Sequence, residues 1–537
     1  DFDALQEQLT KSGFRVLCLA GKVLPLDMTK GKDAAALARE DVESELEFCG
    51  LLATRNAVKA EVAKTVKQLR RSYHRVLMIT GDHPLTACQV ATQVAMAEGK
   101  VLTLEPRGVG DGGGGEEVQN ANGCVLEWRS REDPHKSAKP FAVSKLRDVA
   151  RRYALCVPGW SLARLQEEEL QALAPFVTIF ARVSPQQKEQ VVDALNKTSH
   201  TVMVGDGTND VGALKHAHVG ISLLSSMAPV ASNLGAPGGA PGSHEQMMSD
   251  QAPLVRLGDA SIASPFTYKG DSIKCCIHIL KCGRATLSTV LMMYKIMGLN
   301  SVMSAFAMSV LTLDGVKLGD GQTAVESLFT SMCFFLVSRS NPAKDLAKQR
   351  PTGSVFSWHV LLSLALQVVV HLGVLLTGWR MANEHRPKDF KRDLEGDFAP
   401  NLTNSVVFLL MSAMHASSFF ANYDGHPFMQ PMTANKPLFY SLCLFVVVIL
   451  LTGCEAIPDL NSALSLVEFP GADFRGRIMG LLAVDLLLSV GLSRAVGAVA
   501  VRLGSQAAER RASEWGLGLD GGATGGEKQT KSVKKNS

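Results

Sequence analysis

Long apolar stretches dominate the second half of this 537-residue chain and limit what it can fold into. A bilayer core needs about 20 apolar residues per helix, and a helix satisfies its backbone groups within its own segment. One stretch is short (324–338) and one is borderline (437–453), and for each of them the alternative is a buried core helix. We expect an all-α transmembrane bundle of about six helices over residues 269–501. The stretches lie at about residues 286–313, 324–338, 355–379, 402–420, 437–453 and 478–501.

Basic residues in the links between these stretches indicate their orientation. Four basic residues lie at 339–354, whereas 454–474 contains no Lys or Arg, and the tail at 502–537 is again basic. Because basic links and tails tend to stay in the cytosol, we expect 339–354 and the carboxy terminus to be cytosolic. The link at 380–400 disagrees with this order, since it holds five basic residues although it should lie on the opposite side.

In the first half, a short apolar strand is followed by a glycine-rich turn with two carboxylates and an amide. Residues 202–210 read Val-Met-Val-Gly-Asp-Gly-Thr-Asn-Asp, which places Asp206, Asn209 and Asp210 just after the strand. Glycine lets the backbone turn sharply and approach a ligand. Magnesium prefers oxygen ligands and often shares them with phosphate. We therefore expect Asp206 and Asp210 to hold magnesium beside a phosphate, and the alternative is a plain acidic turn.

Three further segments fit the same site. An apolar strand ends in Thr80-Gly81-Asp82, where the threonine hydroxyl can donate to a phosphoryl oxygen. A Ser-Pro pair is typical of a helix start and places Lys188 in the first turn. A cation is unfavourable there, so we expect an anion beside it. With the strand at 219–224, this alternation predicts a doubly wound parallel sheet that binds ligands beyond the carboxyl ends of its strands.

Composition excludes several classes of function and predicts two inserts. A net charge of +4 and 20% charged residues do not indicate nucleic-acid binding. The 11 cysteines have no Cys-x-x-Cys spacing, which favours free thiols in a reducing compartment over a zinc site. Residues 107–122 and 225–252 lack periodicity and are expected to be disordered inserts.

These motifs resemble those of P-type ATPases, whose phosphorylation domain has the haloacid-dehalogenase fold. Three of the family's four phosphoryl-site motifs have counterparts here: the Thr80 segment, the Lys188 segment and residues 205–210. The chain is most similar to the A branch of the fifth subfamily, the endoplasmic-reticulum transmembrane-helix dislocases. The residues that carry this likeness are 80–88, 210–217, 257–267 and 338–342.

The resemblance implies a role for each candidate residue and a cargo. Asp206 and Asp210 would hold magnesium, and Asn209 would order their loop. ATP would be the substrate, and its transferred phosphoryl group would be contacted by the other four residues. The cargo would be a transmembrane-helix polypeptide, moved by a monomeric full-length enzyme in the endoplasmic-reticulum membrane whose catalytic domain faces the cytosol. The four phosphoryl-contacting residues would be Thr80, Gly81, Asp82 and Lys188.

The resemblance also divides the chain. Residues 1–56 would be the tail of a nucleotide-binding domain and 57–268 a phosphorylation domain with the two inserts. The membrane bundle at 269–501 and a basic tail at 502–537 would follow. The sequence contains no Asp-Lys-Thr-Gly-Thr motif for the phosphoryl acceptor, no Thr-Gly-Glu loop and no lysine-containing ATP motif. We therefore interpret the chain as a carboxy-terminal half that should not turn over ATP alone, because covalent catalysis needs its nucleophile.

Three residues depart from the family pattern at positions that bear on local hinge geometry. His83 stands where Asn is usual, His218 where Asp is usual, and Ala60 follows Lys59 where Pro is common. The end of the tail, Lys534-Lys535-Asn536-Ser537, resembles a dilysine retrieval signal of endoplasmic-reticulum membrane proteins. Solvated lysines are the alternative.

The apolar stretches contain no cluster of carboxylates, which argues against a calcium, sodium or proton pump. Lys295 and Asn300 are central, whereas Asp314 and Glu326 lie near span ends. For Asp485 we expect a structural partner, Arg494 or a neighbouring helix. Two other hypotheses stay open: a polyamine or cation transporter of the sister branch, and a membrane-anchored remnant without turnover. Pro84 and His216 favour the dislocase branch over the sister branch.

Overall fold

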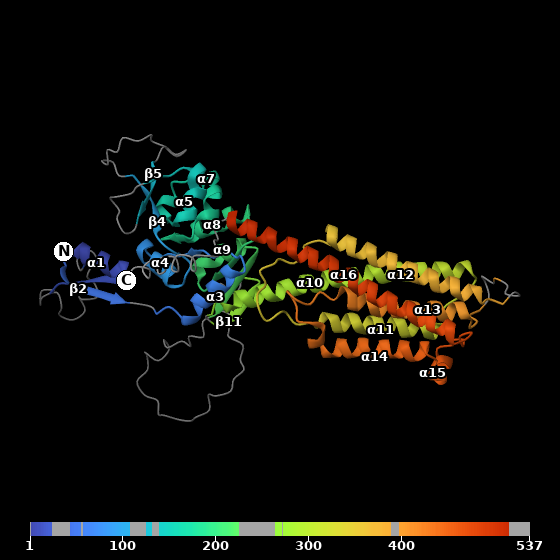
Figure 1. Ribbon diagram of the computed structural model, residues 1–537. Coiled ribbons are helices and arrows are strands. Elements are labelled where there is room, and N and C mark those ends of the chain that lie inside the picture. The colour runs from blue at the N-terminus through green and yellow to red at the C-terminus, as the bar shows by residue number, and fades with distance from the viewer. Residues whose placement is uncertain are drawn as a thin grey trace, which may run out of the picture. The chain divides into compact units, whose positions relative to one another are not determined.

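The computed structural model describes residues 2–23, 43–54, 57–107, 125–130, 139–224, 264–270, 272–387, 392 and 397–514. The chain forms two compact units, residues 1–277 with 512–537 and residues 278–511, each described by itself (Figure 1). Nearly all of the two expected inserts, part of the motif at 257–267 and the lysines of the tail lie outside the described residues.

The first unit is an α/β domain built on parallel strands. Its six-stranded sheet has the order β3-β8-β7-β4-β5-β6, in which β3, β8, β7 and β4 are parallel. Apolar runs make the central strands, and Leu155, Cys156 and Val157 of β7 are fully buried, as is usual for parallel strands covered on both faces. The strands are β3 (Met78–Ile79), β4 (Val101–Pro106), β5 (Leu126–Ser130), β6 (Lys139–Pro140), β7 (Ala154–Pro158) and β8 (Ile179–Ala181).

The sheet differs from the expected single parallel sheet in two respects. The strands β5 and β6 pair antiparallel, because the chain turns back after β4 and returns along its edge. The strands β9 (Val202–Gly205), β10 (Val219–Leu224) and β11 (Phe266–Lys269) form a separate parallel sheet of order β11-β10-β9. A third sheet pairs β1 (Arg15–Gly21) with β2 (Glu47–Thr54).

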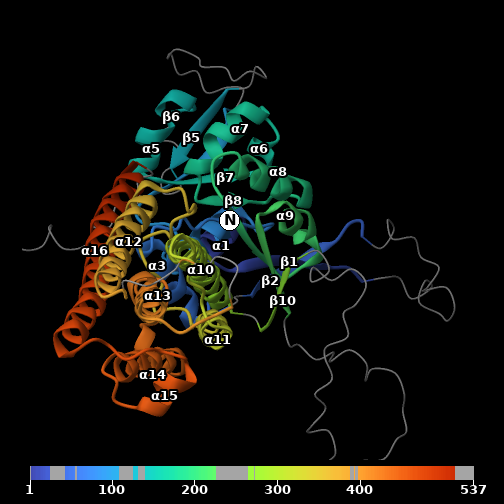
Figure 2. The ribbon, with the colours of Figure 1, turned by 90° about the vertical axis from the view of Figure 1, so that its right-hand side faces the viewer.

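Helices connect these strands, and α8 (Pro185–Asn196) begins where the sequence predicts. Pro185 opens α8 and Ser184 caps it, accepting from the backbone N of Gln187 at 3.3 Å while Gln187 bonds back to Ser184. In Figure 2, α7 and α8 lie beside β7 and β8. The other helices are α1 (Phe2–Lys11), α3 (Ala60–Arg71), α4 (Pro84–Gln93), α5 (Leu146–Arg152), α6 (Gly159–Leu162), α7 (Glu167–Leu173) and α9 (Val211–His216), with short 3-10 helices at Val143–Lys145, Ala174–Phe176 and Thr208–Asp210.

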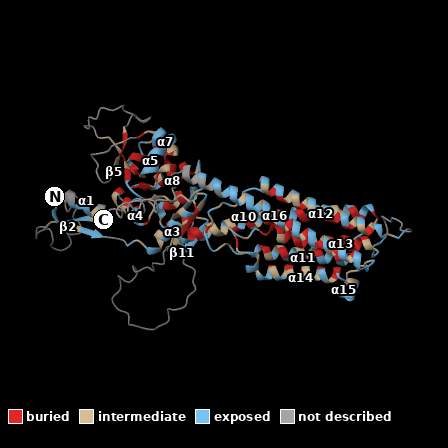
Figure 3. Ribbon diagram, in the orientation of Figure 1, coloured by how far each residue is buried: buried red, intermediate tan, exposed pale blue. Residues whose placement is uncertain are grey.

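All six apolar stretches are helical. Five of the described helices are long and apolar enough to cross a membrane. The sixth stretch forms α11, which is not among these five and carries Asp320 and Glu326 in its first two turns. The helix α13 is buried along most of its length among its neighbours (Figure 3). The helices are α10 (Lys274–Leu313), α11 (Asp320–Ser338), α12 (Trp358–Glu384), α13 (Leu402–Asn422), α14 (Lys436–Gly453), α15 (Pro458–Ala463) and α16 (Ala472–Glu514), with a 3-10 helix at Met432–Ala434.

Asp485 has partners on neighbouring helices, as expected, and Arg494 is not among them. Its carboxylate lies 2.6 Å from Nδ1 of His371 on α12 and accepts from Ser417 of α13 at 2.8 Å. All three side chains are almost fully buried, so this group ties α12, α13 and α16 together. The other polar groups noted in these helices also have partners: Lys295 with Asp424 (2.6 Å), Asn300 with Ser418 (2.9 Å), Asp314 with Arg386 (2.6 Å) and Glu326 with Ser412 (2.9 Å).

Candidate phosphoryl-transfer site

Lys188 and Asp210 meet although they follow different strands. The Nζ atom of Lys188, in the first turn of α8, donates to Oδ1 of Asp210 at 2.7 Å. Both side chains are only 11% exposed. A lysine buried at a helix start needs an anion, and Asp210, which directly precedes α9, supplies it. The expectation of an anion beside Lys188 is therefore confirmed.

Gly205 leaves the space that Asp210 occupies. A Cβ atom at position 205 would lie 2.6 Å from Cβ of Asp210 and 2.7 Å from its Oδ2. Since Cβ atoms do not approach other heavy atoms so closely, any side chain at this position would displace Asp210 from Lys188. The glycine at the end of β9 thus serves close approach, as the sequence motif suggests.

The Thr80-Gly81-Asp82 turn is hydrogen-bonded to the segment that leads into α8. Backbone N of Val183 donates to the carbonyl of Thr80 at 3.2 Å, and N of Arg182 donates to the carbonyl of Asp82 at 2.9 Å. Arg182 has a left-handed backbone with φ of 53°. These bonds hold Thr80 beside the start of the helix that carries Lys188, so the two segments share one end of the sheet.

The side chains of this turn are already engaged. The Thr80 hydroxyl accepts from the backbone N of Asp82 at 3.1 Å, which leaves its own proton available to a ligand. The carboxylate of Asp82 forms an ion pair with Arg15 of β1 at 2.6 Å, and both side chains are exposed, so solvent screens the pair. Arg15 was missed in the sequence because no local pattern links two residues 67 positions apart.

Asp206 and Asn209 are exposed in the turn between β9 and α9. Within the described part of the chain their side chains make no hydrogen bond or ion pair. Their carboxylate and amide oxygens are left open in the same turn that carries the buried Asp210. This all-oxygen donor set fits the ligand preference of magnesium. The roles of all seven candidate residues remain predictions.

Two of the three departures from the family pattern, His83 and His218, make local hydrogen bonds. His83 is the N-cap of α4, where its Nδ1 accepts from the backbone N of Leu85 at 3.3 Å. Burial, and then the Arg182 cation, lowers the pKa of His83, which favours the neutral ring that can accept this bond. Ala60 is the first residue of α3. His218 accepts from the backbone N of Thr201 at 3.3 Å, within the β9–β10 sheet region.

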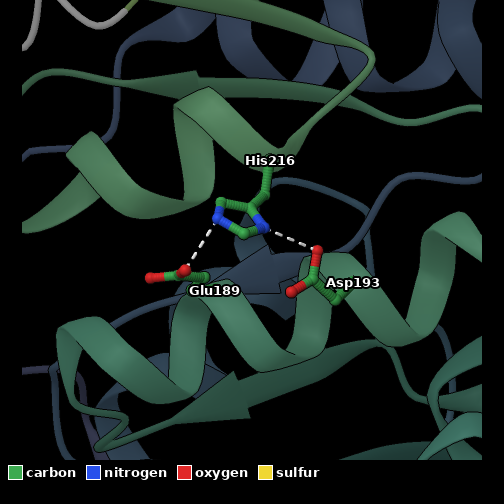
Figure 4. A group of neighbouring side chains, drawn as sticks. All are labelled: Glu189, Asp193 and His216. Atoms are coloured by element: carbon green, nitrogen blue, oxygen red, sulfur yellow. Dashed lines mark hydrogen bonds and ion pairs between the residues drawn. The ribbon is translucent and has the colours of Figure 1, made fainter.

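A second cluster of side chains lies on α8 and α9. His216 stands between Glu189 and Asp193, with its two ring nitrogens 2.7 and 2.8 Å from their carboxylates (Figure 4). The hydrogen bond to Asp193 raises the pKa of His216, and the charges of Asp193 and Glu189 add to this effect. The spacing of the two acids by one helical turn was a weak signal in the sequence, and nothing there indicated that His216 would face them.

Comparisons with known proteins agree with this fold. Residues 163–218 match the family model of haloacid dehalogenase-like hydrolases. A probable manganese-transporting ATPase of Arabidopsis thaliana is 35% identical over 86% of this chain and 42% of its own length. The endoplasmic reticulum transmembrane helix translocase of Saccharomyces cerevisiae is 33% identical over 92% of this chain and 47% of its own length. A polyamine-transporting ATPase of Mus musculus is 31% identical over 91% of this chain and 39% of its own length.

The chain therefore spans less than half the length of these curated relatives. The expected fold class, a haloacid-dehalogenase-like α/β domain followed by a bundle of apolar helices, is confirmed. The names of these relatives give different transported cargoes, so that sequence similarity alone does not identify the cargo of this chain.

Proposed function

We propose that this chain, which resembles the P-type ATPases of the fifth subfamily over about nine-tenths of its length, carries the magnesium- and phosphate-binding side of their phosphoryl-transfer site. The observation that supports this most directly is the buried pair of Lys188 and Asp210, with the Thr80 turn bonded to the same helix start. A cation, a carboxylate and a free hydroxyl proton from three separate segments suit one phosphoryl group and one divalent ion.

Each residue then has a task. Lys188 and the Thr80 hydroxyl stabilise negative charge on the transferring phosphoryl group, at a site whose donors are held in place beforehand. Asp206 and Asp210 hold magnesium, and Asn209 orders the loop between them. Gly81 lets the turn pass close to the phosphate, and Asp82, whose carboxylate pairs with the exposed Arg15, completes that turn. Magnesium, when bound, neutralises charge on the phosphoryl oxygens.

The nucleophile is not among these residues. The 537 residues contain no Asp-Lys-Thr-Gly-Thr motif, and an aspartyl phosphate needs its aspartate. Among the described strands, β3 and β9 each end a sheet and pair on one side only, and both are parallel to their neighbours. A further parallel strand pairing with both would carry an acceptor aspartate to the end of the sheet where Thr80 and Asp206 lie. We infer that these residues alone do not turn over ATP.

The cargo we propose is a polypeptide helix, extracted from the endoplasmic-reticulum membrane by a monomeric full-length enzyme whose catalytic domain and carboxy terminus face the cytosol. Its relatives include endoplasmic reticulum transmembrane helix translocases of three fungi at 30–33% identity. Within the described helices the buried acids Glu326 and Asp485 are bonded to protein side chains and lie on different helices. This arrangement favours an uncharged cargo over a cation.

The second candidate is a transporter of polyamines or manganese, because relatives with those names are 28–35% identical. A reconstitution experiment separates the two. The complete protein in liposomes receives ATP and magnesium, with a hydrophobic helical peptide, spermine or manganese added in turn. We expect the peptide to stimulate ATP hydrolysis, and Asp206→Asn to abolish hydrolysis under every condition. Stimulation by spermine or manganese but not by the peptide would contradict the polypeptide cargo and support the second candidate, a transporter of polyamines or manganese.

A further inference from the structure

A histidine and two carboxylates form a compact group on α8 and α9, outside the residues assigned to phosphoryl transfer. Glu189 and Asp193 lie one turn apart on α8, and His216 is the last residue of α9. One ligand atom from each of the three side chains lies within 4.8 Å of the other two. Their side chains are 38–48% exposed, so an ion can reach them from solvent.

The contact between His216 and Asp193 matches the contact that orients a metal-ligating histidine. Such a histidine binds the ion through one ring nitrogen and donates the other N–H to a carboxylate, which fixes the ring. Here Nδ1 lies 2.8 Å from Asp193 and Nε2 lies 2.7 Å from Glu189 (Figure 4). Bonds of about 2.0–2.2 Å from one ion to both atoms require a separation of about 3.4 Å in tetrahedral geometry. Partly exposed side chains can open by that amount.

Gly212 gives Glu189 its place in this group. A Cβ atom at position 212 would lie 2.6 Å from Oε2 of Glu189. The carboxylate therefore lies against the backbone of α9, and a larger residue would make it shift. Gly212 thus leaves room for the Glu189 carboxylate beside α9, within reach of His216.

We propose that these side chains form a binding site for a divalent transition-metal ion, with Nε2 of His216 and the carboxylate of Glu189 as ligands and Asp193 as the residue that orients the ring. An imidazole nitrogen beside a carboxylate suits Mn²⁺ or Zn²⁺ and distinguishes the site from the all-oxygen magnesium site at Asp206 and Asp210. Water completes the coordination beyond the two ligands that the described residues supply.

An ion at this site would link α8 to α9. Glu189 directly follows Lys188, and α9 directly follows Asp210, so the same two helices carry the buried pair of the phosphoryl site. The expected effect of binding is slower local opening of both helices. The ion must displace the proton from Nε2 of His216, the nitrogen that faces Glu189, while the proton on Nδ1 stays hydrogen-bonded to Asp193, so that proton and metal compete for Nε2.

The test uses the 537-residue chain in detergent with Mn²⁺ as the probe. An excess of Mg²⁺ occupies all-oxygen sites, and electron spin-echo spectroscopy then reports whether the remaining bound Mn²⁺ has a nitrogen neighbour. We expect a ¹⁴N coupling in the wild-type chain, its loss in His216→Ala, and binding about 10–100-fold weaker in Asp193→Asn. The control is His200→Ala, which removes another exposed histidine and should leave the coupling unchanged.

The wild-type spectrum tests the proposed metal site even if a variant folds poorly. Absence of a ¹⁴N coupling from the wild-type chain, at Mn²⁺ concentrations that saturate its binding in excess Mg²⁺, would overturn the proposal. A coupling that persists in His216→Ala, or that disappears equally in His200→Ala, would also overturn it. None of these outcomes depends on ATP hydrolysis or on the nature of the cargo.

Discussion

Replacing Lys188 with alanine tests how strongly the candidate site depends on its buried ion pair. The substitution removes the hydrogen-bond partner of Asp210. This residue is 8% exposed, and its carboxylate accepts from Lys188 at 2.7 Å. A carboxylate left without its cation in this position must either take up water or a proton, or open the turn between β9 and α9. We expect this turn to open more often in Lys188→Ala than in the wild-type chain.

The magnitude follows from the burial of the pair. Breaking a buried ion pair by removing one partner costs about 3–5 kcal/mol. Both side chains here retain 11% exposure, so we expect the lower end of that range. A loss of about 3 kcal/mol corresponds to roughly a 100-fold increase in the opening equilibrium. Asp210→Asn should recover part of this loss in the Lys188→Ala background, because a neutral amide has less need of the cation.

Hydrogen exchange of peptides covering residues 202–216 measures the opening directly. The chain is kept in detergent with a chelator, so that no metal ion replaces the lysine. Lys215→Ala is the matched control, because Lys215 is an exposed lysine on α9. The reasoning fails if Lys188→Ala exchanges no faster than Lys215→Ala. Strict additivity of the two single substitutions in the double variant would refute it as well, because residues in contact should couple.

Three other substitutions probe Gly205, the His83 helix cap and the buried group of Asp485, His371 and Ser417. Gly205→Ala should speed exchange of residues 202–216 and displace Asp210, since its Cβ would lie 2.6 Å from that residue; unchanged exchange would contradict the close-approach argument. His83→Ala should destabilise the start of α4 by about 0.5–1 kcal/mol, whereas His83→Asn should preserve it. Because the pKa of His83 is lowered in the fold, its contribution to the stability of α4 is full above its ordinary pKa of 6.5 and falls as the pH drops through the lowered value. Protection factors in α4 that do not change with pH would refute this. His371→Ala should lower the midpoint of thermal unfolding in detergent, because it leaves Asp485 buried without its 2.6 Å partner; an unchanged midpoint would contradict the assignment of this group as a structural tie.

Local signals in the sequence were sufficient for the parts of the site that depend on neighbouring residues. The Ser184-Pro185 start of α8 and the need of Lys188 for an anion both follow from the properties of a helix terminus. The apolar stretches also predict helices reliably, because a helix is the form in which such a segment satisfies its own backbone.

Contacts between distant segments could not be predicted in the same way. Three contacts join residues that no helical or strand period in the sequence relates. They are Asp82 with Arg15, Asp485 with His371, and His216 with the acids of α8. The separation of the parallel strands into two sheets was missed for the same reason, since strand order depends on which edges meet.

Formation of a phosphoenzyme tests the central assignment most directly. The complete protein is incubated with magnesium and ATP labelled at the γ-phosphate, then quenched in acid and treated with hydroxylamine. The account predicts a labelled protein whose label is lost in hydroxylamine, and labelling that is abolished by Asp206→Asn and by Lys188→Ala but kept in His200→Ala. Absence of a hydroxylamine-sensitive label from the wild-type protein, or equal labelling of Asp206→Asn, would contradict it.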